Sequence, residues 1–338
     1  MISPIAGIVP LNAKAFDLSV MIHSNVKGPA KGTVKLDLPS GWTAAQQQFV
    51  TAKDGDDQNL KFQVVPGQIQ QRPYTLTAVA TYNGRDYKEG YHTTGYPGLR
   101  PYNLYRPATY RTTGVDVKVA PGLTVGYIVG AGDDVPQSLT NLGIIVHFLS
   151  SGDLAGGDLS RFNTIVLGVR AYAVREDLKT YNARLLDYVK NGGVVIVQYN
   201  TLEYDHDYGP YPYKMGSNPE EVTDEHSKVE ILDPANPVFS WPNRITQKDF
   251  DGWMEERGSK FLQSWDGHYQ PLLETHDAGQ EPQKGGLVYA RYGKGVYIYN
   301  AYAFYRQLPE GVPGAYRLFA NMISLGKSPQ VAGGQGDN

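Results

Sequence analysis

The chain has 338 residues, a formal net charge of −3 and no cysteine. The lack of cysteine excludes disulfide bonds, thiolate metal sites and a cysteine nucleophile, and the balanced charge argues against a nucleic-acid binder. The chain has no apolar run long enough for a transmembrane helix and no signal peptide at its start. We therefore expect an excised fragment or a mature form. Charged residues make up 19%, against 25 tyrosines and 38 glycines, which favours an extracytoplasmic location.

The first part of the chain alternates polar and apolar side chains in short runs, as in residues 15–22, 32–38, 59–64 and 74–80. A period of two predicts half-buried strands. Strands without intervening helices predict an immunoglobulin-like β-sandwich over residues 1–95, with Trp42 at one end of its core.

Two further segments lack this alternation. Residues 96–122 are rich in Pro, Tyr and Arg, and we interpret them as a linker packed along the domains on either side. Residues 328–338 are rich in Gly and Gln, which predicts a disordered tail.

Beyond residue 123 the pattern changes to apolar runs separated by helical segments. The predicted strands cover 123–129, 144–149, 164–169, 194–199, 286–291 and 295–300, and the predicted helices cover 135–142, 154–162, 178–190 and 314–323. This alternation predicts a parallel sheet with flanking helices over residues 123–327. The long insert at 202–285 is expected to build a binding face.

Polar residues follow several of these strands. The carboxyl ends of parallel strands lie together at one edge of the sheet, and ligands of open α/β sheets bind at this edge. With two tyrosines of the insert, the candidate ligand-binding residues are Asp133, Asp134, Arg170, Tyr172, Gln198, Asn200, Tyr204 and Tyr208. Gly130 and Gly132 suggest a nucleotide site, but a third glycine is missing and the two aspartates would repel a pyrophosphate. A tight turn with an acidic helix N-cap is the favoured alternative.

The insert also begins with acids, a histidine and tyrosines. Asp205, His206, Asp207 and the more distant His226 are candidate ligands for a divalent cation. Their spacing matches no metal motif, so no cofactor is predicted and solvated loop charge is favoured. The tyrosines from 204 to 213 form either a sugar-stacking platform or a loop packed on its own prolines.

A hydrolase that works with two carboxylates leaves no local motif. Its candidate catalytic residues are Asp133, Asp134, Glu203 and Asp205. A serine nucleophile is not predicted, because the fourth strand ends in Gln198 and lacks a G-x-S-x-G turn.

Several long segments carry a resemblance, among them VGYIVGAGDDVPQSL, LLDYVKNGGVVIVQYNT, PNRITQKDFDGWMEERG and KGGLVYARYGKG. They resemble the C-terminal region of long bacterial LmbE/PIG-L-type deacetylases, in which a zinc-dependent N-acetylsugar deacetylase domain precedes a β-sandwich and an α/β module. The zinc motif of that family is absent here. Residues 123–201 and 286–323 resemble the flavodoxin-like, class I glutamine-amidotransferase-like fold of trehalose-utilisation-type proteins, and the nucleophile position of that fold falls at Gln198.

These observations favour a non-catalytic accessory region that binds carbohydrate or a partner protein beside a sugar deacetylase. A carbohydrate-active hydrolase and a structural, oligomer-forming module are the alternatives. One structural feature distinguishes these hypotheses. If Asp133, Arg170, Gln198 and Glu203 line one open pocket, an active or binding site is favoured. If Tyr199 or Tyr204 fills that pocket, the α/β domain is expected to be a scaffold.

Overall fold

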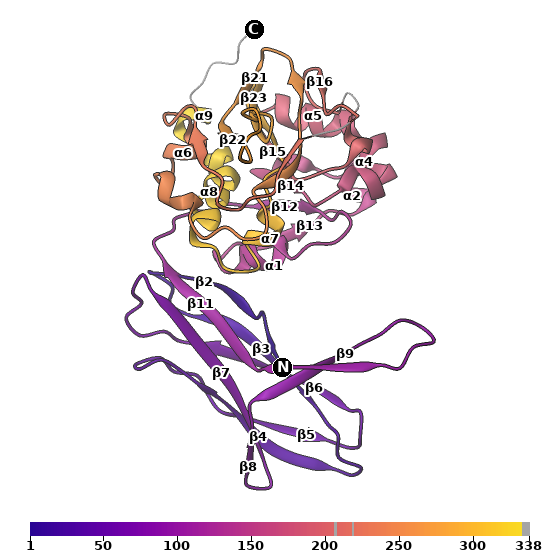
Figure 1. The fold of residues 1–338 in the computed structure, drawn as a ribbon, viewed down its shortest axis with the longest axis vertical. Coiled ribbons are helices and arrows are strands. Elements are labelled where there is room, and N and C mark those ends of the chain that lie inside the picture. The colour runs from indigo at the N-terminus through magenta and orange to yellow at the C-terminus, as the bar shows by residue number, and fades with distance from the viewer. Residues whose placement is uncertain (206–207, 218–219, 333–338) are drawn as a thin grey trace. The chain divides into compact units, whose positions relative to one another are not determined.

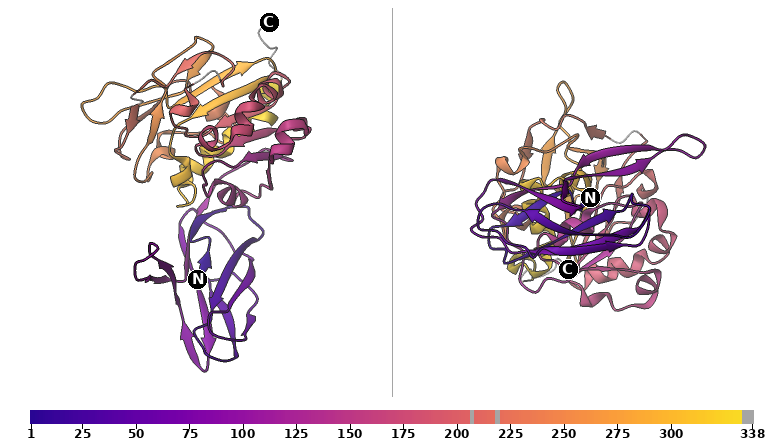
Figure 2. Two further views of the ribbon diagram at one scale, coloured as in Figure 1. Left: turned by 90° about the vertical axis from the view of Figure 1, so that its right-hand side faces the viewer. Right: turned by 90° about the horizontal axis from the view of Figure 1, so that it is seen from below.

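The computed structural model describes residues 1–205, 208–217 and 220–332. The chain forms two compact units, Met1–Asp116 and Val117–Asn338 (Figure 1). Strands make up the first unit, and the helices belong to the second (Figure 2). Within the described residues, no helix combines the length and apolar character needed to cross a membrane.

The N-terminal unit is a sandwich of two sheets. The larger sheet contains β2 (Ala6–Pro10), β11 (Thr109–Val115), β7 (Pro73–Tyr82), β4 (Ala30–Asp37), β5 (Gln47–Thr51) and β8 (Arg85–Tyr87). The smaller sheet contains β1 (Ile2–Ser3), β3 (Phe16–His23) and β6 (Asp57–Val64). Both sheets contribute to one hydrophobic core, which includes Val20, Phe62 and Leu76. Trp42 is 6% exposed and packs against Phe16 and Tyr74 at one end of this core, as the sequence predicts for a β-sandwich.

The prediction of a packed linker at residues 96–122 is wrong. Part of it, β11, lies inside the larger sheet between β2 and β7. Another part, β10 (Tyr102–Pro107), pairs with β9 (Glu89–Thr94) in a separate two-stranded ribbon. The first unit therefore runs to Asp116. The segment TYRTTGV of β11 is rich in strand-forming residues but its apolar alternation is weak, and its pairing with β2 and β7 places it in the sheet.

The C-terminal unit is built on a mixed sheet with the order β13-β12-β14-β15-β24-β23-β21. Its strands are β12 (Val125–Ile128), β13 (Val146–Phe148), β14 (Thr164–Leu167), β15 (Val194–Val197), β21 (Tyr269–Pro271), β23 (Leu287–Tyr292) and β24 (Gly295–Asn300). The strands from β13 to β24 in that order are parallel, β23 runs antiparallel to them, and β21 pairs antiparallel with β23. The apolar runs that predicted the parallel strands are completely buried in β12, β14 and β15.

Helices occupy the connections of this sheet. They are α1 (Val135–Thr140), α2 (Ser151–Gly156), α3 (Ala171–Val174), α4 (Glu176–Thr180), α5 (Asn182–Lys190), α6 (Pro237–Ser240), α7 (Phe304–Gln307), α8 (Pro313–Ser324) and α9 (Pro329–Ala332), with short 3₁₀ turns at 159–161, 202–204, 247–250 and 325–327. The helix predicted over 178–190 is divided at Tyr181 into α4 and α5. The tail predicted to be disordered begins with α9, and residues 333–338 lie outside the described residues.

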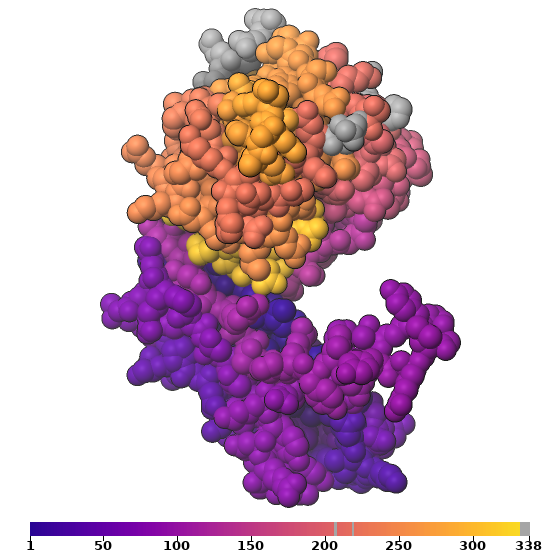
Figure 3. Space-filling model, viewed as in Figure 1, coloured from indigo at the N-terminus to yellow at the C-terminus, as the bar shows by residue number. Residues whose placement is uncertain are grey.

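The insert at 202–285 is organised by short strand pairs. These pairs are β16 (Tyr213–Lys214) with β20 (Ser264–Trp265), β17 (Glu220–Val222) with β19 (Gly258–Phe261), and β18 (Val229–Ile231) with β22 (Leu273–Thr275). One further strand, β21, extends the main sheet. The insert forms much of the face of the C-terminal unit that is seen in Figure 3.

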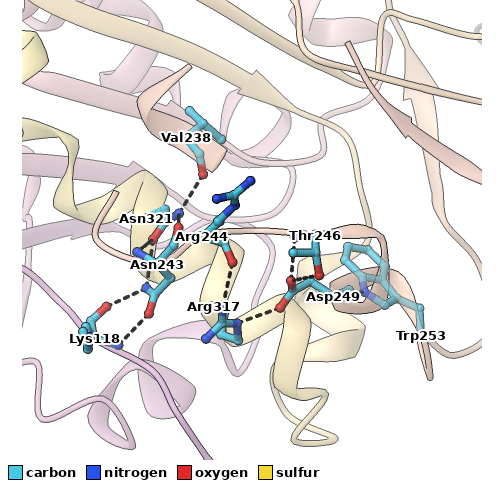
Figure 4. Close-up of polar contacts among 9 residues, drawn as sticks. All are labelled: Lys118, Val238, Asn243, Arg244, Thr246, Asp249, Trp253, Arg317 and Asn321. Carbon is cyan, nitrogen blue, oxygen red and sulfur yellow. Dashed lines mark hydrogen bonds and ion pairs between the residues drawn. The ribbon is translucent and has the colours of Figure 1, made fainter. Parts of the chain in front are cut away.

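Two buried asparagines join the insert to the closing helix α8 (Figure 4). Asn321 is fully buried; its Nδ2 donates to the carbonyl oxygens of Val238 (2.9 Å) and Asn243 (2.7 Å). Its Oδ1 accepts from the backbone amide (2.9 Å) and the Nδ2 (2.8 Å) of Asn243. Asn243 also exchanges two hydrogen bonds of 2.8 Å with the backbone of Lys118. Three segments far apart in the chain thus share one satisfied polar network.

A charged contact lies beside this network. The Nε of Arg317 on α8 donates to Oδ1 of Asp249 at 2.7 Å, and its Nη2 donates to the carbonyl of Arg244. The other carboxylate oxygen of Asp249 accepts from the backbone and hydroxyl of Thr246. The indole of Trp253 donates to the carbonyl of Asp249 at 3.0 Å (Figure 4). Asn243 and Asp249, which make these contacts with α8, both belong to segment 242–258, one of the segments that carry the family resemblance.

Replacing Asn321 with Ala is expected to lower the free energy of unfolding by about 3 kcal/mol, because several buried polar groups lose their partners at once. Urea unfolding followed by tryptophan fluorescence measures the loss. Gln137→Ala, which removes an exposed side chain on α1, is the matched control and should change stability by less than about 0.5 kcal/mol. Equal stabilities of the two variants would contradict the role given to the network.

Candidate functional site

The carboxyl ends of the parallel strands bring several predicted residues together, and Asp133 is the first. Its Oδ1 accepts from the Tyr127 hydroxyl at 2.6 Å and from the Val135 amide at 3.0 Å, and its Oδ2 accepts from the Val169 amide at 3.0 Å. A carboxylate already holds the amides that a phosphate would need at the start of α1. Asp134 is exposed and precedes α1 without a capping side-chain bond.

The glycine before Asp133 has a packing role. A Cβ at Gly130 would collide with the carbonyl oxygen of Val169, so the turn after β12 needs glycine to approach the turn after β14. This contact accounts for the glycine without a nucleotide.

Gln198 occupies the position after β15. It is 1% exposed, and its Nε2 donates to the Tyr127 hydroxyl (2.9 Å) and, more weakly, to the Leu167 carbonyl (3.4 Å). Burial, followed by the charge of Asp133, raises the pKa of Tyr127 well above its usual value, so the phenol stays neutral. Gln198 therefore joins β15 to β12 and β14 and presents no nucleophile to solvent.

Asn200 and Tyr172 are also internal. The Oδ1 of Asn200 accepts from the Tyr172 amide at 3.1 Å, and its Nδ2 donates to the Gln198 carbonyl at 2.8 Å. The Tyr172 hydroxyl donates to Oδ1 of Asn182 at 2.7 Å. Both side chains are fully buried and are therefore not accessible to a ligand.

Tyr204 fills the space beside the sheet rather than facing solvent. It is 1% exposed, and its ring stacks on those of Tyr213 (4.8 Å between centroids) and Tyr299 (5.1 Å). Its hydroxyl lies 2.7 Å from that of Tyr297. The half-buried Tyr208 stacks on Tyr172 at 4.5 Å. The tyrosine run therefore packs under the insert. Gln198 and Tyr204 are buried at the edge of the sheet where the sequence suggests an open pocket.

A group of exposed and half-buried side chains lies at the same edge of the sheet. We call Arg170, Tyr199, Glu203, Glu256 and Tyr305 the open edge. The rings of Tyr199 and Tyr305 lie 5.6 Å apart, and the Tyr305 hydroxyl donates to Oε1 of Glu256 at 2.9 Å. The Arg170 amide donates to the Tyr199 carbonyl at 2.8 Å, and its side chain is exposed. This surface combines two adjacent aromatic rings with charged groups of both signs.

Electrostatics and backbone strain mark this surface further. A hydrogen bond from Thr201 lowers the pKa of Glu203, with a smaller effect from the charge of Arg170. Burial is the main cause of the raised pKa of Tyr199. Arg170 and Glu255 adopt positive φ angles of 55° and 66°. Such conformations are costly for residues other than glycine and gather at functional sites.

Sequence reasoning missed Tyr305 and Glu256. They lie about a hundred and about fifty residues beyond Tyr199, so no local motif connects them. Only the aromatic and acidic character of the surrounding segments was visible.

The candidate metal ligands do not assemble in the described residues. Oδ1 of Asp205 accepts from the Met215 amide at 2.7 Å. The exposed His226 lies 3.9 Å from Glu225 through its Nε2. His206 and Asp207 lie outside the described residues, and no group of three His, Cys, Asp or Glu suited to a metal occurs among the others.

No protein-family model matches the chain, and no curated protein matches it significantly. Among solved structures, it is similar to a cold-adapted β-galactosidase from Rahnella sp. R3 (TM-score 0.34, 16% identity, 62% of this chain and 31% of that one). It is also similar to the exo-β-1,4-mannosidase Op5Man5 from Opitutaceae bacterium strain TAV5 (TM-score 0.34, 10% identity, 56% and 33%) and to the periplasmic chaperone SfaE (TM-score 0.21, 9% identity, 36% and 60%). The chain spans about a third of the length of either glycosidase. Likenesses this weak carry no argument about function.

Proposed function

We propose that the chain is a non-catalytic module that binds carbohydrate at the open edge. The observation that carries the proposal is the pair of half-buried rings of Tyr199 and Tyr305, flanked by Arg170, Glu203 and Glu256. Ligand sites combine an aromatic surface with a few polar groups that fix orientation. A sugar ring offers apolar C–H groups to the tyrosines and hydroxyls to the charged groups.

The hydrolase alternative has less support. A glycosidase needs one carboxyl group whose pKa is raised, so that it stays protonated and acts as general acid. At the open edge the pKa of Glu203 is lowered instead. Asp133 has its carboxylate oxygens engaged by three donors, and Gln198 stands buried where the resembled fold carries its nucleophile.

The family proposal rests on the resemblance and on one feature of the sheet. The parallel strands follow the order β13-β12-β14-β15-β24, which is the 2-1-3-4-5 order of flavodoxin-like sheets. This order supports a glutamine-amidotransferase-like reading of the C-terminal unit, beside an immunoglobulin-like reading of the sandwich. We propose that the chain accompanies a PIG-L-type N-acetylsugar deacetylase outside the cytoplasm and presents carbohydrate to it.

Calorimetric titration with N-acetylated and de-N-acetylated oligosaccharides tests the binding proposal. Tyr199→Ala and Tyr305→Ala are each expected to weaken binding about tenfold, because a ring contact is worth about 1 kcal/mol beyond its buried area. Tyr102→Ala, at an exposed tyrosine of the N-terminal unit, is the control and should bind as the unaltered chain does. Absence of heat with every glycan, or equal affinities in all three variants, would reject the carbohydrate proposal.

A further inference from the structure

A cavity of about 750 Å³, open to solvent on one side, lies in the N-terminal unit between the two sheets of the sandwich. Val20 and Ile22 on β3 line one side, and Ala78 and Ala80 on β7 line the other. The β9–β10 ribbon, which projects from the sandwich in Figures 1 and 3, contributes Tyr91 and Tyr105 to the lining. The size is within the range of small-molecule sites, about 300–1,000 Å³.

Small side chains produce this space. Alternate residues of β7 point inward, and in chain order these are Tyr74, Leu76, Ala78, Ala80 and Tyr82. The end near Tyr74 is filled by Trp42, whose ring centroid lies 4.9 Å from that of Tyr74. The end near Ala78 and Ala80 is not filled, although protein interiors are normally packed as densely as organic crystals.

The strand beside β7 in the same sheet, β4, contributes one small side chain to this space. Ala30 lines the cavity together with Ala108, whereas the β4 residues paired with Ala78 and Ala80 are Leu36 and Val34. The cavity follows β7 from Ala78 to Tyr82, a span of about 13 Å at the rise of an extended strand. A slot of this length between two sheets suits a linear chain better than a compact ring system.

Charge separates the interior from the mouth. The buried lining residues are Val20, Ser24, Ala30, Phe49, Ala78 and Ala108, none of which is charged. At the mouth, Asp86 and Glu89 are exposed, and the ammonium group of Lys88 lies 3.4 Å from Asp37. His23 is hydrogen-bonded to Asp57 at 2.7 Å. The charged side chains of the mouth are therefore acidic or already paired, which does not favour an anionic head group.

Polar groups of the ribbon complete the mouth. The Tyr91 hydroxyl donates to Oδ1 of Asn25 at 2.9 Å, and the rings of Tyr91 and Tyr105 lie 5.3 Å apart. We propose that the cavity binds the alkyl chain of an uncharged amphiphile, with the chain between the sheets and the polar head beside these two tyrosines. This site is separate from the open edge and does not depend on the carbohydrate proposal.

Calorimetry with hexyl, heptyl and octyl β-D-glucoside, each below its micelle-forming concentration, tests the site. Each added methylene should tighten binding about fourfold, which is the effect of about 0.8 kcal/mol per buried CH₂. The double variant Tyr199→Ala/Tyr305→Ala should keep this chain-length dependence, so failure of the open edge and failure of the cavity are distinguishable. The same affinity for all three glucosides would overturn the proposal.

A filling variant locates the binding. Ala80→Leu places a larger side chain in the mouth of the cavity and should weaken octyl glucoside binding at least tenfold, while thermal unfolding shows whether the sandwich remains intact. Ala78→Val is the smaller step, to be used if Ala80→Leu unfolds, and should give a partial loss. Ala13→Leu, at a partly buried residue that does not line the cavity, should bind as the unaltered chain does. Unchanged binding by a folded Ala80→Leu or Ala78→Val variant would overturn the proposal.

Discussion

Replacing Gln198 with Glu is expected to destabilise the C-terminal unit by about 4 kcal/mol at pH 7 and to have little effect at pH 4. Gln198 is 1% exposed, and its Nε2 donates to the Tyr127 hydroxyl and the Leu167 carbonyl. A protonated glutamic acid can replace one of these bonds. A carboxylate would face the Leu167 carbonyl without water and with Asp133 nearby, so its pKa in the folded state would rise.

The sign of the effect follows from this rise. In the unfolded chain the new carboxyl ionises near pH 4.3, whereas in the folded chain it holds its proton to a higher pH. The stability deficit therefore begins near pH 4.3 and grows by about 1.4 kcal/mol per pH unit until the folded group also ionises. Urea midpoints measured from pH 4 to pH 8 test this slope. Gln137→Glu, at an exposed position of α1, should show almost no change of its stability deficit with pH. A stability deficit of Gln198→Glu that does not change with pH would contradict the burial of this residue.

The C-terminal unit is expected to unfold between about pH 10 and pH 11 because of its buried tyrosines. Burial is the first cause of the raised pKa values of Tyr172, Tyr204, Tyr297 and Tyr299. In the unfolded chain the same phenols ionise near pH 10, so the unfolded state loses protons first and stability falls as the pH rises. Four such groups lower the free energy of unfolding by about 6 kcal/mol at pH 11, which is comparable to the whole stability of many domains.

Two signals measured in one titration check this result. Phenolate absorbance should rise in two steps, first from solvent-exposed tyrosines and then from the buried ones together with the loss of helical circular dichroism. Tyr299→Phe, which removes one phenol and its 2.6 Å bond to the Lys260 carbonyl, should shift the second step to higher pH. Ionisation of all tyrosines near pH 10 with an intact fold would refute the expectation.

The sequence was most informative where structure is local. Apolar runs such as 164–169 and 194–199 predicted buried strands, because a parallel sheet covered on both faces needs continuous apolar residues. It was least informative for 96–122, where β11 exists by pairing with β2 about a hundred residues earlier. A strand of this kind has no strong alternation of its own.

The candidate site divides in the same way. The rule that polar residues gather at the carboxyl ends of parallel strands placed Asp133, Arg170 and Gln198 at one edge. Which of them face solvent depends on neighbours from other strands, such as Tyr127 beneath Gln198. The Asn243–Asn321 contact spans 78 residues of sequence and was not foreseeable from either segment.

The parallel pairing of β2 with β11 has a mechanical consequence. The two strands run in the same direction, with Ala6 opposite Arg111 and Pro10 opposite Val115. A pulling force applied ahead of β2 and beyond β11 therefore slides one strand along the other. The hydrogen bonds of the pair are then loaded together in shear rather than opened one after another. Once the short strand β1 has detached, this pair bears the tension first and resists extension of the N-terminal unit.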